Sequence, residues 1–427
     1  MTSRLATGYA LAAVALTLGP LLVAVLCSLR SDSAVTFMDR ASTSALRGLA
    51  ALGISFHHIW YWVADRPDTV PTLSLTGQMG VAVFLALSGY GLQISYLRHG
   101  AEDGGPGLAI RPLSALLLLL VLACSALAPI VNNLGVVVPV LLVGCLVCFR
   151  RAKEPALANY VGSRLARLYV LVVLVGAFWL AMAAVSGTQP LTAHSVILAL
   201  TGADVWFIQY IVTWYLVFAL TWVVPGRFRI GIMLVWAVAW SLALALRGNA
   251  YMAEFGLVFP AGSLVAVLVA ERRRERAVGV AGLFALAVTV LFLVFLVMRP
   301  SLAVAARSLL LGGSGTQATG GLTDRLWLPL ARLVPPLVVF LAACGLSWIA
   351  ARAQVRSPLL AYIGTCSLAI YLLNYPLLVQ YDPVLYRGPL SAMQWPAVVL
   401  LLAVAAGFTA VDTRIQRLLG RRHLRTA

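Results

Sequence analysis

The chain has 427 residues, of which 62% are hydrophobic and only 11% are charged. A soluble enzyme is nearer half apolar and a quarter charged, so this composition excludes an ordinary soluble protein and indicates a polytopic membrane protein. The formal charge of +17 comes mainly from arginines in short loops between apolar runs, which predicts a role in topology and no nucleic-acid partner.

Apolar runs of bilayer-spanning length follow one another along the whole chain. A transmembrane helix needs about 20 mostly apolar residues, so the runs predict an all-α protein with about thirteen spans. The six cysteines lie in or beside these runs without paired spacing, which favours small core residues and predicts no metal site. The predicted spans are 7–27, 45–64, 78–97, 112–130, 134–149, 166–185, 203–224, 230–247, 256–271, 277–298, 327–351, 358–379 and 394–411.

The basic residues predict the orientation of these spans. Short loops rich in arginine stay in the cytoplasm, and they alternate regularly here if the N-terminus lies outside and the C-terminus lies in the cytoplasm. We therefore expect a multi-pass protein of the cell membrane. The first run could instead be a signal peptide, but it lacks a strongly basic start and a small-residue cleavage site, which favours an anchor helix. Three parts are predicted, namely an anchor and cytoplasmic linker at 1–44, a membrane domain at 45–411 and a basic cytoplasmic tail at 412–427.

The second run carries polar residues in register. Arg47 and His58 are eleven residues apart, so on a helix they lie only about 20° apart around the axis and about 16 Å apart along it. Asp65 returns to the same face at the outer end, whereas His57 points about 80° away. Ionisable residues inside a span are costly and are usually functional, although a lone histidine can also be a hydrogen-bonded packing residue.

Four segments resemble, in order, the motifs of the acyltransferase-3 family of integral membrane O-acyltransferases. The first is RGLAAL at 47–52, with ten residues between Arg47 and His58, and the second is GVAVFLALSGY at 80–90. The third is SRLARLY at 163–169, and the last is LAYIGTCSLAIYLLNYP at 360–376. The resemblance implies a core of ten helices, to which the first span and an inserted hairpin at about 112–149 add three.

The chain departs from the family pattern at three places. Asn374 stands where the family generally has a histidine, and Val170 stands where a proline often follows the basic motif. Many relatives carry a glutamate shortly after a mid-domain tryptophan, where this chain offers Gln209 and Thr213 instead. These departures keep open a degenerate relative that serves as a binding or sensory module.

The resemblance implies a membrane O-acyltransferase. It would move an acyl group, most simply acetyl, from cytoplasmic acyl-CoA to a hydroxyl of a glycan, a lipid-linked sugar or a secreted metabolite. His58, with Arg47 in register, is the expected catalytic pair, because acyl transfer to an alcohol needs a base for the hydroxyl proton. The rival from another class is an exporter or flippase of polysaccharide or lipid, which would show inverted repeats and charged pairs at mid-membrane, and neither is evident here.

Other residues are candidates for binding. Arg164 and Arg167 are expected to hold the phosphates of the acyl-CoA donor, or else to face lipid phosphates as topological residues. Ser367, Tyr371 and Asn374 share a helix face and would donate to an acyl oxygen or an acceptor, although such residues also serve as packing contacts between helices. Trp60 and Asp65 at the outer end would contact the acceptor, unless Trp60 belongs to an interfacial aromatic belt.

Overall fold

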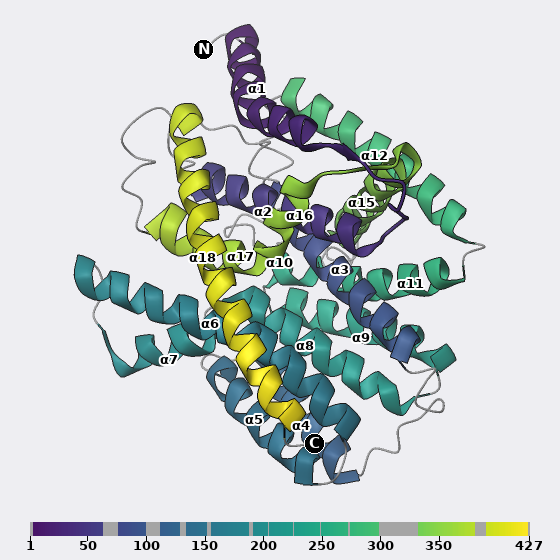
Figure 1. Ribbon diagram of the computed structural model, residues 1–427, viewed down its shortest axis with the longest axis vertical. Coiled ribbons are helices and arrows are strands. Elements are labelled where there is room, and N and C mark those ends of the chain that lie inside the picture. The colour runs from purple at the N-terminus through teal and green to yellow at the C-terminus, as the bar shows by residue number, and fades with distance from the viewer. Residues whose placement is uncertain are drawn as a thin grey trace. The chain divides into compact units, whose positions relative to one another are not determined.

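Helices make up almost the whole described structure, as the sequence predicted (Figure 1). Beside them, the described residues contain one small antiparallel pair of strands, β1 (Arg30–Ser31) and β2 (Val355–Arg356). The computed structural model describes residues 3–62, 76–99, 112–128, 134–151, 155–187, 191–203, 205–224, 226–247, 249–271, 274–298, 332–380 and 390–425.

Contacts divide the chain into two units, each described by itself. Unit 1 contains residues 1–94 and 254–406, and unit 2 contains residues 95–253 and 407–427. In unit 1 lie α1 (Ser3–Ser28), α2 (Arg40–Trp62), α11 (Val258–Ala270), α12 (Glu275–Met298), α15 (Val334–Ala353), α16 (Pro358–Thr365), α17 (Ser367–Tyr375) and the π-helical turn η3 (Pro376–Gln380). In unit 2 lie α4 (Pro112–Leu127), α5 (Leu134–Arg151), α6 (Pro155–Ser186), α7 (Ala193–Thr201), α8 (Trp206–Leu220), the 3-10 turn η2 (Thr221–Val223), α9 (Gly226–Leu246) and α10 (Ala250–Ala253). The helices α3 (Thr76–His99) and α18 (Leu390–Arg425) belong partly to each.

The helices confirm a polytopic membrane protein, with fewer clear spans than the thirteen expected. Within the described residues, seven helices are long and apolar enough to cross a membrane, or up to nine if each of two bent pairs is one span. Apolar stretches of α1, α4 and α5 are shorter helices of the same character. The helix α2 is outside both groups, because its arginines, histidines and serines lower its hydropathy.

The run 358–379 was expected to be a single span, and the structure divides it. The helices α16 and α17 meet at Cys366 with a bend of 62°. The Cys366 N–H bonds back to the carbonyls of Ile363 and Gly364, and the Thr365 hydroxyl bonds to the Tyr362 carbonyl. These short-range bonds replace the regular helical pattern, so α17 starts as a separate helix at Ser367.

Glycines allow α2 and α3 to approach their neighbours closely. A Cβ on Gly48 would collide with the Leu360 carbonyl, and one on Gly364 would collide with the Ser44 carbonyl, so the backbones of α2 and α16 touch. Likewise a Cβ on Gly89 in α3 would collide with the Phe259 carbonyl of α11. Small residues at such crossings are typical of helices that pack inside membranes.

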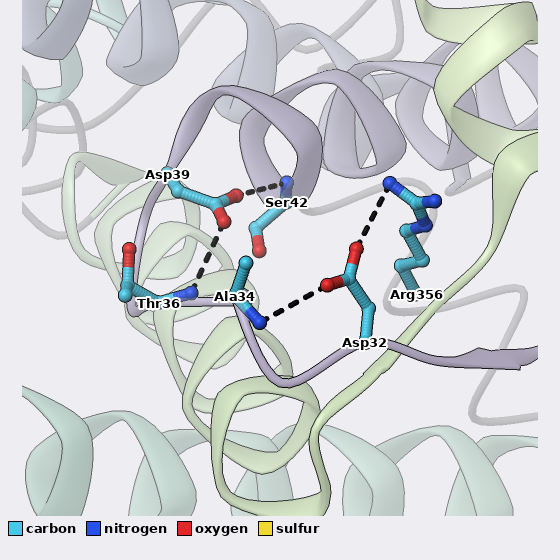
Figure 2. Close-up of polar contacts among 6 residues, drawn as sticks. All are labelled: Asp32, Ala34, Thr36, Asp39, Ser42 and Arg356. Carbon is cyan, nitrogen blue, oxygen red and sulfur yellow. Dashed lines mark hydrogen bonds and ion pairs between the residues drawn. The ribbon is translucent and has the colours of Figure 1, made fainter.

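The start of α2 is fixed by polar contacts that Figure 2 shows. The Asp39 carboxylate accepts hydrogen bonds from the backbone N–H groups of Ser42, at 2.6 Å, and Thr36, at 3.1 Å, and thereby caps the helix. In the preceding linker, Asp32 forms an ion pair of 2.9 Å with Arg356, beside the pairing of β1 with β2. These contacts hold the first turns of α2, on which Arg47 lies.

Replacing Asp39 with Ala is expected to lower the free energy of unfolding by about 0.5–2 kcal/mol, because the first turn loses its cap. The variant Asp32→Asn is expected to cost less than about 1 kcal/mol, since the Arg356 side chain of this pair is 49% exposed and surface ion pairs contribute little. Thermal unfolding of both variants in detergent measures the difference. A larger loss in Asp32→Asn than in Asp39→Ala would contradict this account of the helix start.

Candidate functional site

The helix α2 carries both residues of the expected catalytic pair. It is continuous from Arg40 to Trp62, so Arg47 and His58 occupy one helical face, about 20° apart. The helix packs against α15, α16 and α17 within unit 1. It also contacts the first turns of α3, where the Thr76 hydroxyl donates to the Gly53 carbonyl over 2.7 Å.

His58 is partly buried, and its Nδ1 atom is not satisfied. No hydrogen-bond partner for this buried nitrogen exists among the residues that the structure describes. The neighbouring His57 has its ring centroid 5.4 Å away, and its ring packs so closely on Gly77 that a Cβ there would overlap it. His57 is thus held in helix packing, while His58 keeps a nitrogen for another group.

Arg47 reaches from α2 to α3. Its Nη2 donates to the Leu87 carbonyl over 3.5 Å, inside the GVAVFLALSGY segment. In the same segment, the Ser88 hydroxyl donates to the Phe84 carbonyl over 2.8 Å. The two sequence segments that open the predicted domain are therefore joined in the structure by the arginine side chain.

The three expected polar residues of the last segment all lie on α17, which packs against α2. Ser367 is buried and Tyr371 is partly buried. Asn374 has no exposed surface, and neither its amide nitrogen nor its amide oxygen has a hydrogen-bond partner within the described ranges. Buried amides are nearly always paired, so this side chain marks a place where a further polar group belongs.

Trp60 is buried and holds helices together. Its side chain is 1% exposed, and its indole nitrogen donates to Gln394 Oε1 over 3.1 Å. The same oxygen accepts from the Thr17 hydroxyl, so Trp60 joins α2 to α18 and α1. Its predicted contact with an acceptor stays a prediction. Asp65 lies outside the residues that the structure describes.

In unit 2, the two arginines of the basic segment have different surroundings. Arg164 is partly buried, its guanidinium carbon lies 5.8 Å from the centroid of the Tyr160 ring, and its buried Nε has no partner in the described part of the chain. Arg167 is exposed. Arg164 therefore lies beside an aromatic ring, whereas Arg167, three residues later, lies at the surface.

Arg229, near the start of α9, is a candidate that the sequence did not reveal. It is 1% exposed, its guanidinium carbon is 3.5 Å from the centroid of the Tyr96 ring, and its Nε donates to the Thr221 hydroxyl. Its two terminal nitrogens have no hydrogen-bond partner among the described residues. In the sequence, Arg229 is a loop arginine before an apolar run, which is typical of a residue that sets topology. Its contact with the Tyr96 ring becomes visible only in the structure.

Aromatic rings connect Arg164 to Arg229. Tyr160 contacts Trp222 at 4.8 Å between ring centroids, and Trp222 contacts Tyr96 at 5.9 Å. Since Arg164 lies at Tyr160 and Arg229 lies at Tyr96, we define the aromatic arginine cluster as these five residues. Guanidinium groups over aromatic faces keep their N–H donors available for an anion.

The polar residues that replace the family glutamate make internal bonds. The Gln209 side chain donates to the Ala203 carbonyl, and the Thr213 hydroxyl donates to the Gln209 carbonyl over 2.9 Å. Thr213 also lies 2.7 Å from the Ser125 hydroxyl. Both side chains are thus used in holding α8 in place within unit 2.

A protein-family model matches most of the chain. Residues 40–411 match the acyltransferase-3 model, which is described as an acyltransferase domain. Neither a search of curated proteins nor a search of solved structures returned a match. The matched range runs from the start of α2 into α18, so it contains His58, Arg47, Arg164 and Asn374 and leaves α1 outside.

Proposed function

The chain belongs to the acyltransferase-3 family and is a membrane acyltransferase, and on this premise we propose that it is an O-acyltransferase with acyl-CoA as its donor. The acyl group is most simply acetyl. The acceptor is a hydroxyl of a glycan, a lipid-linked sugar or a secreted metabolite. The observation that carries this proposal is the unpartnered Nδ1 of His58 on the same helical face as Arg47.

His58 acts as the general base in this proposal. It takes the proton of the acceptor hydroxyl while the oxygen attacks the carbonyl carbon of the thioester, giving a tetrahedral intermediate. The intermediate collapses by breaking the carbon–sulfur bond, and the thiolate of CoA leaves and receives the proton. The products are an ester and free CoA, so no further reactant is required.

Donors near the acyl oxygen would stabilise its developing negative charge. Asn374 is suited to this role because its amide is fully buried and unpartnered on a helix that packs against α2. Ser367 and Tyr371 lie on the same face of α17, at spacings of four and seven residues from Ser367 to Tyr371 and Asn374. We propose that this face contacts the acyl group or the acceptor.

The aromatic arginine cluster is the proposed contact for the phosphates of the donor. Phosphate oxygens match the fork of N–H groups on a guanidinium, and Arg164 and Arg229 both retain buried N–H groups without partners in the described structure. The exposed Arg167, three residues along α6 from Arg164, would add positive charge near this contact. We place this side in the cytoplasm, with the N-terminus outside the cell membrane and the C-terminus inside, because the arginine-rich loops alternate accordingly.

The purified protein, supplied with acetyl-CoA, is expected to release free CoA thiol faster when an alcohol acceptor is added. Octyl glucoside and octanol are suitable probes, one offering sugar hydroxyls and the other a single apolar hydroxyl. Thiol release and the ester, identified by mass spectrometry, are measured together. If neither acceptor yields thiol or ester with any acyl-CoA tested, an exporter or a binding module replaces the acyltransferase as the explanation.

A further inference from the structure

A cavity in unit 1 contains an acidic residue that the proposed chemistry does not use. The cavity has a volume of about 230 Å³, and residues of α3, α12, the start of α15 and the segment before α11 line it. Its polar side chains are Gln78, Glu254, Thr289 and Arg332. The rest of its wall is apolar and includes Phe292 and Val338. We call it the Glu254 cavity.

Glu254 carries a carboxyl group and is buried. It is 3% exposed, the Gln78 side chain donates a hydrogen bond to its carboxylate, and the positive charge of Arg332 acts on it. The Oε1 atom remains buried without a partner, and so does Nε of Arg332, as far as the described residues extend. An unsatisfied acceptor and an unsatisfied donor therefore occur together on one cavity wall.

This pair of atoms matches the chemistry of a hydroxyl group. A hydroxyl can donate its proton to a carboxylate oxygen and accept a hydrogen bond from a guanidinium N–H at the same time. The apolar remainder of the wall offers no partners for the other hydroxyl groups of a sugar, which would lose hydrogen bonds to water on entering. The wall thus favours a ligand with one hydroxyl on an apolar framework.

The size of the cavity sets a second limit. Pockets for drug-sized ligands usually measure about 300–1,000 Å³, so a space of 230 Å³ suits a single ring or a short chain. Only the hydroxyl-bearing end of a larger molecule would be enclosed.

The cavity lies close to the helix that carries His58. Gly77 packs against the His57 ring, and the next residue along α3, Gln78, lines the cavity. The cavity wall therefore includes the residue that follows the contact of α3 with His57.

We propose that the Glu254 cavity is a binding site for an alcohol with an apolar carbon framework, separate from the site of acyl transfer at His58. Binding of this alcohol does not require the proposed acyl transfer. Glu254 and Arg332 would hold the hydroxyl end, and the apolar wall would exclude a polyol.

Photoaffinity labelling of the full chain in detergent tests this binding. The probes are octanol carrying a diazirine and octane carrying the same diazirine, and the labelled positions are mapped by mass spectrometry. In the wild-type protein, octanol is expected to label the cavity residues of α12 and α15 about fivefold more than octane, because only octanol offers a hydroxyl. Equal labelling by the two probes would overturn the proposal.

Variants identify the residues responsible. Glu254→Gln is expected to reduce octanol labelling to the level of octane, and Val338→Trp is expected to abolish labelling of the cavity by both probes through filling it. Glu271→Gln is the matched control, since Glu271 is an exposed carboxylate at the end of α11, and it should label as the wild type does. Unchanged hydroxyl-dependent labelling in Glu254→Gln would remove Glu254 from the site. Thermal unfolding confirms that each variant is folded.

The outcome for the cavity can be separated from the outcome for the enzyme. If octyl glucoside is acetylated while octanol and octane label the cavity equally, the acyltransferase stands and the cavity proposal fails. If octanol labelling depends on its hydroxyl and on Glu254 but no acyl transfer occurs, the binding site stands and the proposed reaction fails. Acyl transfer to octyl glucoside, measured in the same preparation, shows whether the labelled protein is active.

Discussion

Replacing His58 with Ala is expected to abolish acyl transfer to any acceptor while the protein still inserts and folds. Loss of a general base usually lowers the rate by about 10²–10⁴-fold. The side chain is only partly buried and its Nδ1 makes no hydrogen bond to the described residues, so its removal breaks no bond that the structure records at that atom. The measurement is ester formation from acetyl-CoA at saturating acceptor, together with thermal unfolding of the same preparation.

His57→Ala is the matched control for this prediction. It changes the same residue type on the same turn, but its ring packs against Gly77 of α3. We expect a lower thermal stability and a turnover within about tenfold of the wild type, because the base is retained. If His58→Ala kept full activity, or if His57→Ala alone lost it, His58 would not be the base.

The second large effect is expected at the aromatic arginine cluster. Arg229→Lys preserves the charge but removes the planar fork that holds phosphate, and Arg164→Gln removes the charge altogether. Hydrogen bonds to charged groups contribute about 1.5–3 kcal/mol each, and about 1.4 kcal/mol corresponds to a tenfold change in affinity. Each variant should therefore raise the KM for the acyl-CoA donor by about tenfold to a hundredfold, with little change in kcat.

Arg417→Gln is the control for the arginine variants, because Arg417 is an exposed arginine of α18 in the same unit. Its donor KM should equal that of the wild type. Comparison of CoA with dephosphorylated pantetheine thioesters adds a second reading, since a residue that binds phosphate matters little for a donor without phosphate. A donor KM that stays constant in both Arg164→Gln and Arg229→Lys would exclude the cluster as the phosphate contact.

The sequence predicted the class of fold because membranes impose strong patterns. Apolar runs of about 20 residues predicted helices, and the structure has helices at each of those runs within its described residues. Hydropathy averages over a window, so it could not show that the run 358–379 divides at Cys366, where a few backbone and side-chain bonds decide the outcome. The three-part division at residues 44/45 and 411/412 stays a prediction, although α18 continues without a break to Arg425.

The candidate site was predictable only where residues lie close in sequence. The register of Arg47 with His58, and of Ser367 with Tyr371 and Asn374, follows from helix periodicity alone. Arg229 and Glu254 were missed because their significance depends on partners far along the chain, Tyr96 for the first and Gln78 and Arg332 for the second. Their roles, like those of the other site residues, remain predictions that the variants above would test.

The contact between Gly48 and Gly364 limits how this protein can move during a reaction cycle. With two backbones touching and no side chains between them, α2 and α16 have no room to slide closer and would lose their packing on separating. We therefore expect α2 and α16 to keep their relative position at this crossing. The chain departs from regular helix after this contact, at Cys366 between α16 and α17. The distance between α2 and α16 is therefore expected to stay the same when substrates bind.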